Sequence, residues 1–250
     1  MNPLAKPTIL TAVIIPPVTD SLVAQSNGHP TTRLFDPTAM LPADSAPPPA
    51  IIAVVTIPTP RFAPDWFVAR RMRSTLPQYA AAAGLRWKAY TLMSGPRRFG
   101  GIYEWLDRAA ADRWFDPAWF ERIRTSYRPG GGVRFLEVLA AVDAAALPTN
   151  ANERQDGVAY LQDVAASAEV TSVARVITEA CRSAHGLLFA RLVRADDGRW
   201  QLLTVWGSDV DAAAGHRRCA EATGVSSAIV EQFHVPVLLP PAAMGQAPRS

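Results

Sequence analysis

The order of apolar and polar positions along the chain runs through the same series of elements twice. Continuous β-branched runs such as "IIAVVTIP" predict buried strands, and apolar residues recurring every three to four positions, as in "EVTSVARVITEACRSA", predict helices. The first series gives expected strands at 51–58, 85–93, 99–105 and 133–140 and helical stretches at 64–83 and 107–126. The second gives strands at 158–165, 186–195, 200–207 and 228–239 and helices at 169–184 and 209–223.

Proline and glycine divide these stretches. Pro77 interrupts the first helical stretch and Asp116-Pro117 the next, so each is expected to kink or split. Gly84 and Gly224 follow helical stretches, as helix-ending glycines do. The turn "DDGR" joins two strands of the second series as a hairpin, and "PGGG" is expected to be a turn before a strand.

Both series therefore follow the β-α-β-β-α-β order of a ferredoxin-like unit, which makes the fold class α+β with two tandem units. The stretch before the first strand is rich in proline, threonine, serine and asparagine and buries too little apolar surface to fold alone. One short strand near 12–15 is its only expected regular element. We divide the chain into an irregular arm (1–49), a first unit (50–145), a linker (146–157), a second unit (158–240) and a flexible tail (241–250).

Charge and composition narrow the function classes. The formal net charge is +3 with no basic block, so no nucleic-acid partner is expected. The apolar run "TILTAVII" is too short to cross a membrane or to act as a signal peptide, so we expect a cytoplasmic protein without a membrane partner. Cys181 and Cys219 lie outside any metal-binding spacing, and glycine motifs for phosphates or dinucleotides are absent. Neither a metal nor a cofactor is predicted.

One segment resembles a known family. In "GLLFARLVRADDGRWQLLTVWGSDVDAAAGH" a glycine precedes the second strand, a tryptophan ends the third, and an alanine-rich helix carries a histidine. Gly186, Trp206 and His216 hold these places, and the segment is similar to the core of the dimeric α/β-barrel proteins of the antibiotic-biosynthesis-monooxygenase type. The first unit resembles a nearby branch of monooxygenase-like proteins through "FGGIYEWLDRAAADRWF". The resemblance covers roughly residues 50 to 240.

The resemblance implies a barrel in which two sheets face one another and enclose a cavity. One sheet with helices on a single side leaves an apolar face bare, and two units in one chain can pair these faces internally. The expected fold is therefore a pseudo-dimeric α/β barrel, with a homodimer of whole chains as a further possibility. The resemblance also implies a cofactor-independent monooxygenase acting on an aromatic or polyketide-like molecule. The alternatives are a non-redox cyclase, isomerase or lyase on the same barrel, or a non-catalytic barrel that binds a small ligand.

Candidate site residues follow from the chemistry that such an oxygenase needs: a base, a donor that holds an anion, and an aromatic pocket. His216 is the expected general base, with Tyr103 and Arg134 as further catalytic candidates. Six residues are expected to bind the substrate, a small hydrophobic or aromatic molecule: Trp66, Trp87, Lys88, Trp105, Trp206 and His234.

Each candidate has a purely structural alternative. Lys88 can be a solvated surface lysine, and His216 can be a helix-capping or surface histidine. Phe99, Gly101, Tyr103 and Trp105 share one face of their strand, with Glu104 on the other, and the sequence leaves open which face meets the helices. The aromatic residues of the following helical stretch are expected to be core: Trp114, Phe115, Trp119 and Phe120.

Overall fold

A computed structural model describes residues 48–60, 62–93, 97–143, 157–164, 184–223 and 229–241, together with Arg175 and Glu179. The expected strand at 12–15, most of the arm, and nearly all of the linker, of the helix at 169–184 and of the tail lie outside the described residues.

The first unit follows the predicted order, with both helical stretches divided. Its strands are β1 (Ile51–Pro58), β2 (Leu85–Met93), β3 (Arg98–Trp105) and β4 (Gly132–Asp143). The first helical stretch is split into α1 (Asp65–Ser74) and α2 (Leu76–Ala80), and the second into α3 (Arg108–Trp114) and α4 (Pro117–Ser126). Each split lies just before a proline, since Pro77 and Pro117 both sit at the start of the following helix, where no backbone N–H is needed.

The second unit has the strands β5 (Gly157–Val164), β6 (Leu187–Ala195), β7 (Trp200–Trp206) and β8 (Ile229–Leu239), and the helix α6 (Asp209–Thr223). Gly198, in the turn between β6 and β7, has a φ of +82°. Glycine adopts that conformation at little cost, so the predicted hairpin closes here.

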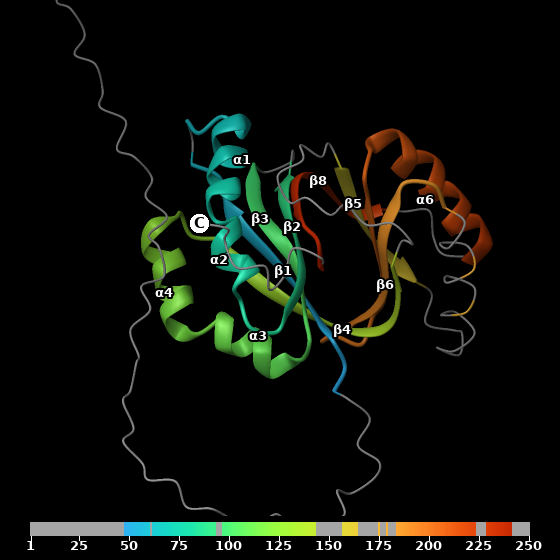
Figure 1. Cartoon of the computed structure of the whole chain (residues 1–250), viewed down its shortest axis with the longest axis horizontal. Helices are drawn as coiled ribbons and strands as arrows, with labels where there is room; N and C mark the ends of the chain where they lie inside the picture. Colours follow the sequence, from blue (N-terminus) through green and yellow to red (C-terminus); the bar gives the residue numbers. More distant parts are fainter. Residues whose placement is uncertain are drawn as a thin grey trace, which may run out of the picture. The chain divides into compact units, whose positions relative to one another are not determined.

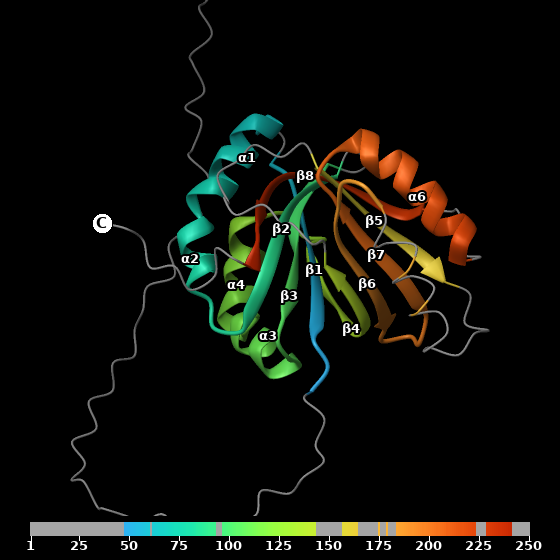
Figure 2. The same ribbon diagram turned by 45° about the vertical axis from the view of Figure 1, so that its right-hand side comes forward.

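The eight strands form one closed antiparallel barrel in the order β1-β3-β2-β8-β5-β7-β6-β4. Each unit contributes four neighbouring strands in ferredoxin-like order. The units join where β2 pairs with β8 and where β4 pairs with β6. In Figure 1 the helices α1–α4 lie on one side of the barrel and α6 on the other, and Figure 2 shows the strands between them. Closure leaves no unpaired edge within the barrel.

The side chains that point into the barrel pack as a core to which both units contribute. Trp87 from β2 stacks on Phe189 from β6 at a ring-centroid distance of 4.5 Å. An eight-stranded barrel is just wide enough for such side chains to fill it. This core is buried and mostly apolar. It contains a few polar groups, among them the charged pair Glu104 and Arg191.

Glu104 and Arg191 join the two units inside the barrel. Glu104 Oε2 accepts hydrogen bonds from Arg191 Nε at 2.6 Å and from Trp87 Nε1 at 2.5 Å. Arg86 lies 3.0 Å from the other carboxylate oxygen. Arg191, on β6 of the second unit, also donates to the Val142 carbonyl and the Asp143 carboxylate on β4, so it is bonded to two strands of the first unit.

A left-handed glycine precedes the second strand of each unit. Gly84 has a φ of +84° and Gly186 a φ of +76°. The carbonyl of each accepts a hydrogen bond from the residue that follows the third strand, Leu106 in the first unit and Gly207 in the second. The two units thus share a detail of backbone geometry that helix and strand order alone does not require.

Candidate functional site

The helix-covered face of the first sheet carries an unusual cluster. Strand alternation places Lys88 and Tyr90 of β2, and Tyr103 and Trp105 of β3, on the outward face beneath the helices. Lys88 lies directly opposite Tyr103 in the β2–β3 ladder. The strand face that carries Tyr103 and Trp105 is therefore the one that meets the helices, a choice that the sequence alone did not decide.

Lys88 is buried to 1% exposure in this cluster. Its Nζ lies 3.0 Å from the ring centroid of Tyr79, 3.7 Å from that of Tyr90 and 4.4 Å from that of Tyr103. Among the described residues no carboxylate forms an ion pair with it. The Lys88 amine is therefore surrounded by aromatic ring faces, which can stabilise a cation there in place of a counter-ion.

Tyr79 belongs to α2, the short helix produced by the break at Thr75. Its ring contacts those of Trp114 at 4.9 Å, Tyr103 at 5.6 Å and Tyr90 at 5.9 Å between centroids. Thr75 also hydrogen-bonds the Tyr90 hydroxyl at 2.7 Å. The division of the first helical stretch therefore brings the Tyr79 ring into the middle of the cluster.

Burial changes the acid–base behaviour of the whole cluster. Desolvation lowers the pKa of Lys88 well below its usual value, which favours the uncharged amine. Desolvation also raises the pKa of Tyr103 and Tyr90 well above the usual value, and raises that of Tyr79. The cluster thus holds an amine able to accept a proton among phenols that keep theirs.

Two indole N–H groups beside these rings lack acceptors. Trp105 Nε1 and Trp114 Nε1 are buried without a hydrogen-bond partner among the described residues. The two rings lie 5.8 Å apart between centroids. Unpaired buried donors are uncommon and are therefore informative about function. We name the set Lys88, Tyr79, Tyr90, Tyr103, Trp105 and Trp114 the lysine–tyrosine cluster.

The residues expected from sequence to form one site lie in different parts of the barrel. Lys88, Tyr103 and Trp105 come together in the lysine–tyrosine cluster, while Trp206 and His216 lie on the helix-covered face of the second unit. Trp87 lies in the barrel interior.

The other three candidates lie at the surface. Trp66 is 69% exposed on α1. Arg134 is exposed and paired with Glu231 at 2.7 Å. His234 is exposed on β8.

Sequence reasoning missed Tyr79 and Tyr90 and assigned Trp114 to the core alone. Tyr90 could have been found, because it lies two residues after Lys88 on the expected strand and therefore shares its face. Tyr79 could not, since its contacts depend on where the helix breaks. The expected core role of the other helical aromatics holds for Phe115 and Trp119, which are buried, while Phe120 is 45% exposed.

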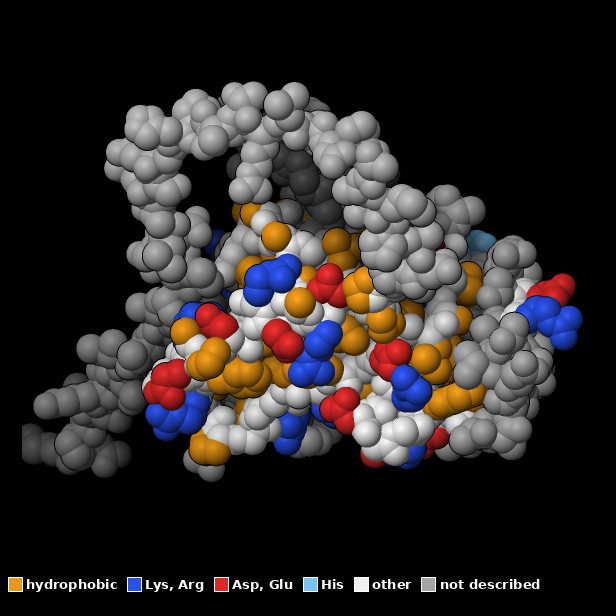
Figure 3. All heavy atoms as spheres, turned by 90° about the horizontal axis from the view of Figure 1, so that it is seen from below, with side chains coloured by type: hydrophobic (Ala, Val, Ile, Leu, Met, Phe, Trp, Pro, Cys, Tyr) orange, Lys and Arg blue, Asp and Glu red, His pale blue; other side chains and the backbone are white. Residues whose placement is uncertain are grey.

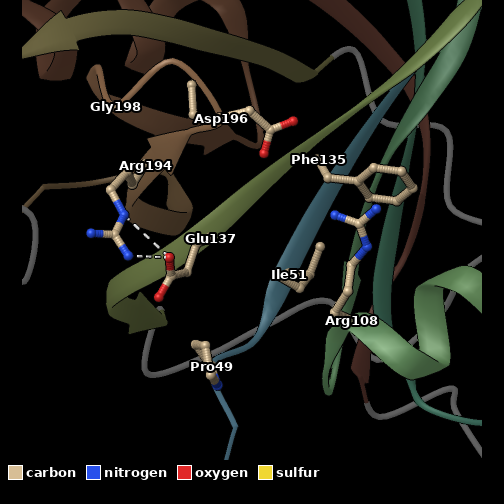
Figure 4. A pocket seen from close by; sticks show the side chains of 9 residues that line it. Pro49, Ile51, Arg108, Phe135, Glu137, Arg194, Asp196 and Gly198 are labelled. Carbon is tan, nitrogen blue, oxygen red and sulfur yellow. Dashed lines mark hydrogen bonds and ion pairs between the residues drawn. The ribbon is translucent and has the colours of Figure 1, made fainter.

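A hollow of about 580 Å³ lies at the surface between the start of β1 and the β6–β7 turn, apart from the lysine–tyrosine cluster. Arg108 stacks on Phe135 at 4.1 Å, and Arg194 pairs with Glu137 (Figure 4). Figure 3 shows how acidic and basic side chains alternate over apolar ones when the molecule is seen from below. Because these charges are exposed and mostly paired with one another, we favour the buried cluster as the functional site.

Two further observations concern the described residues only. No three His, Cys, Asp or Glu side chains come together there as ligands of a metal ion would. No helix in the same part of the chain is long and apolar enough to span a membrane.

The fold resembles several solved structures. A proposed monooxygenase from Fusobacterium nucleatum matches with a TM-score of 0.57 and 13% identity, covering 77% of this chain and 95% of that one. A proposed monooxygenase from Lactobacillus acidophilus matches with a TM-score of 0.50 and 13% identity, covering 77% and 97%. An anthrone oxidase-like protein matches with a TM-score of 0.50 and 10% identity, covering 76% and 92%.

No protein-family model matches the sequence, and a search of curated proteins found no match. The structural likenesses have low sequence identity and therefore show the fold alone. That fold is the predicted one: two tandem ferredoxin-like units that close a dimeric-type α/β barrel within one chain.

Proposed function

We propose that the protein is a cofactor-independent monooxygenase that oxygenates an electron-rich aromatic molecule, such as an anthrone or polyhydroxylated aromatic ring, at the lysine–tyrosine cluster. The observation that carries the proposal is the buried Lys88 amine, enclosed by three tyrosine rings and without a counter-ion among the described residues. The relatives in fold include proposed monooxygenases and an anthrone oxidase-like protein, which agrees with this choice.

In the proposed reaction Lys88 is the general base. Its uncharged amine takes a proton from an activated C–H or phenolic O–H of the substrate, leaving a substrate anion and an ammonium group. The faces of Tyr90 and Tyr103 stabilise that ammonium, because ring quadrupoles attract cations. A site arranged in this way lowers the energy of the charged state that the proton transfer creates.

The substrate anion needs donors for its oxygen. The N–H groups of Trp105 and Trp114 are buried, unpaired among the described residues, and adjacent to the cluster. Donors that already point into a dry site stabilise a developing anion without reorganising solvent. His216 and Arg134, expected from sequence to serve here, lie elsewhere and have no part in this mechanism.

The chemistry then balances with molecular oxygen as the oxidant. The anion passes one electron to O2, and the two radicals combine to form a carbon–oxygen bond in a peroxide. The remaining C–H bond and the O–O bond then break, so that the hydrogen leaves with the outer oxygen as hydroxide and a carbonyl is left. Lys88 returns its proton to that hydroxide, which departs as water. For a CH2 group the net change is CH2 + O2 → C=O + H2O, in which the substrate supplies all four electrons.

Tyr79 occupies the centre of the cluster, in contact with Lys88 and the other rings. We infer that an aromatic substrate enters by displacing this ring, so that its own ring takes the place of the phenol. Because α2 has only five residues, such a movement disturbs little of the fold. Tyr79→Ala should therefore open a ring-sized space that binds phenol, detected as a phenol-dependent rise in Tm absent from wild type and from Tyr79→Phe.

Oxygen uptake with anthrones and polyhydroxynaphthalenes tests the reaction itself. Lys88→Met keeps the length and apolar body of the side chain but removes the base, and should lower turnover about 100-fold or more. The chain has only one other lysine, Lys6. Lys6→Arg is the matched control and should retain full activity. Wild-type turnover by Lys88→Met, or tight binding without any oxygen uptake by the wild type, would overturn the proposal.

The protonation of Lys88 can be measured directly, because a protein labelled at lysine gives signals from only two side chains. Burial lowers the pKa of Lys88, so the unfolded chain binds this proton more tightly than the folded one. Stability that is present above the ordinary pKa of 10.5 is lost as pH falls toward the lowered value. As pH falls over that range, the free energy of unfolding of Lys88→Met should therefore rise relative to that of wild type. A Lys88 signal that titrates near 10.5 would contradict this expectation.

A further inference from the structure

The second unit presents the corresponding face of its sheet beneath α6, and strand pairing identifies which positions correspond. Tyr103 lies opposite Lys88 on one side and Ala53 on the other. In the second unit Thr204 holds the matching place, opposite Ala190 and Tyr160. A lysine and a tyrosine of the first unit are thus replaced by an alanine and a threonine.

Helix α6 adds a further small residue on this face. Counting from the tryptophan that ends the third strand, Gly215 of α6 corresponds to Trp114 of α3. The Trp206 ring approaches the backbone of Gly215 so closely that an added Cβ would lie 2.0 Å from it. The second unit therefore has smaller residues in the places of Lys88, Tyr103 and Trp114, although Tyr160 is larger than its counterpart Ala53.

Polar atoms without partners gather on this face. Gln162 and Thr204 are each 1% exposed, and both amide atoms of Gln162 and the Thr204 hydroxyl have no hydrogen-bond partner among the described residues. The same holds for Trp206 Nε1 and His216 Nδ1. Each such buried group left unpaired costs roughly 1–3 kcal/mol. A cluster of them on one face therefore supplies donors and acceptors that a bound polar molecule can use.

The positions of these atoms define a site. Tyr160 lies directly opposite Thr204 on the neighbouring strand, and Gln162 is the next outward-facing residue after Tyr160. His216 approaches from α6, with its ring 5.2 Å from that of Tyr160. Apolar side chains complete the surroundings: Ala190, Leu192, Leu202 and Val164.

We propose that this face of the second unit binds a small, neutral, planar molecule that carries a hydrogen-bond donor beside an acceptor, such as a lactam or cyclic imide. The carboxamide of Gln162 presents one acceptor and one donor side by side, and a lactam edge presents the complementary pair. Trp206 adds a donor and the Thr204 hydroxyl can serve either role. Alternation also puts Arg194 on this face, at the end of β6, but its guanidinium is exposed and paired with Glu137, which disfavours an anionic ligand.

The test compares 2-quinolone with its N-methyl derivative, which keeps the ring and the carbonyl but lacks the N–H. We expect 2-quinolone to raise the Tm of the full-length wild type and the N-methyl compound to have little effect. Gln162→Met and Thr204→Val keep the side-chain volume and should each weaken 2-quinolone binding about 10-fold.

Gln201→Met is the matched control. Gln201 is equally buried but points to the other face of the barrel wall, and its amide is paired with Asp163 at 2.9 Å. This variant should lose stability yet bind 2-quinolone as wild type does. If neither compound binds, and Gln162→Met instead raises the Tm of the free protein, the polar atoms are merely unpaired and the proposal is wrong. Oxygen uptake plays no part in this readout, so it is independent of the proposed oxygenase activity.

Discussion

The two units use the same strand geometry to present two different surfaces to their helices. The first fills its face with Lys88, Tyr103 and Trp114. The Lys88 amine lies against the Tyr103 ring, and the Trp114 ring contacts that of Trp105. The second carries Thr204 and Gly215 at the matching positions, together with polar atoms that find no partner among the described residues. Equivalent backbone positions therefore do not imply equivalent chemistry, and each face has to be interpreted from its own side chains.

The two units are alike in the turns before their second strands and at the starts of the helices that follow their third strands. Gly84 and Gly186 have the same left-handed conformation and accept the same kind of hydrogen bond. Asp107 caps α3, and Ser208 precedes α6 and accepts a hydrogen bond from the Asp211 N–H. Turns and helix starts fix how each helix crosses its sheet, whereas the sheet faces are free to differ. The following predictions test this division.

The largest expected effect concerns the pair that joins the units. Arg191→Met leaves the Glu104 carboxylate buried without its main partner, which typically costs about 3–5 kcal/mol. Both units should lose stability together, because Arg191 belongs to β6 of the second unit and bonds β3 and β4 of the first. Denaturant unfolding followed by tryptophan fluorescence measures the change.

The double variant Glu104→Leu/Arg191→Met serves as its control and should recover much of that loss, since no isolated charge is left behind. A cost below about 1 kcal/mol for Arg191→Met alone would show that the units do not depend on the pair.

The next effect concerns the shared glycines. Gly84→Ala would place a Cβ 2.7 Å from that of Ala110, and Gly186→Ala would place one 2.5 Å from Asp211. Each should lose about 2–4 kcal/mol, combining left-handed strain with crowding. Gly198 has a similar φ but nothing within 4 Å of an added Cβ, so Gly198→Ala should lose only about 1 kcal/mol. Clearly unequal losses of unfolding free energy for Gly84→Ala and Gly186→Ala would show that the two turns are not equivalent.

The smallest effect concerns the helix caps. Asp107→Ala removes the acceptor of the Ala110 N–H and should cost about 1 kcal/mol. Ser208→Ala should bring a similar loss in the second unit. It should also raise the pKa of Asp211 toward its ordinary value, because the Ser208 hydroxyl is the main group that lowers it. Carboxyl NMR titration detects that shift, and an unchanged Asp211 would contradict the capping assignment.

The fold could be predicted because its signals are local. Apolar runs marked the strands, and Pro77 and Pro117 marked the breaks between helices. The repeated order of elements then gave two ferredoxin-like units. The strand β4 extends to Asp143, beyond the predicted end, because it pairs with β6 of the other unit and no local signal records that partner.

The site could be predicted only in part. Lys88, Tyr103 and Trp105 were singled out by residue type and strand position, and they come together. His216 and Tyr103 were expected to act jointly, yet they lie on faces of different units. Which face of a strand meets the helices, and which unit a helix covers, depend on closure of the barrel. Those facts are global, so alternation along a single strand cannot supply them.

Because both units belong to one chain, their sequences can evolve separately. In a symmetric homodimer every substitution is made twice, so a buried amine like Lys88 would appear on both sides of the barrel with its cost doubled. Here a mutation at Lys88 has no enforced copy at Ala190. Selection can therefore act on one half of the barrel while the other half keeps its sequence, although both fold around the same interior.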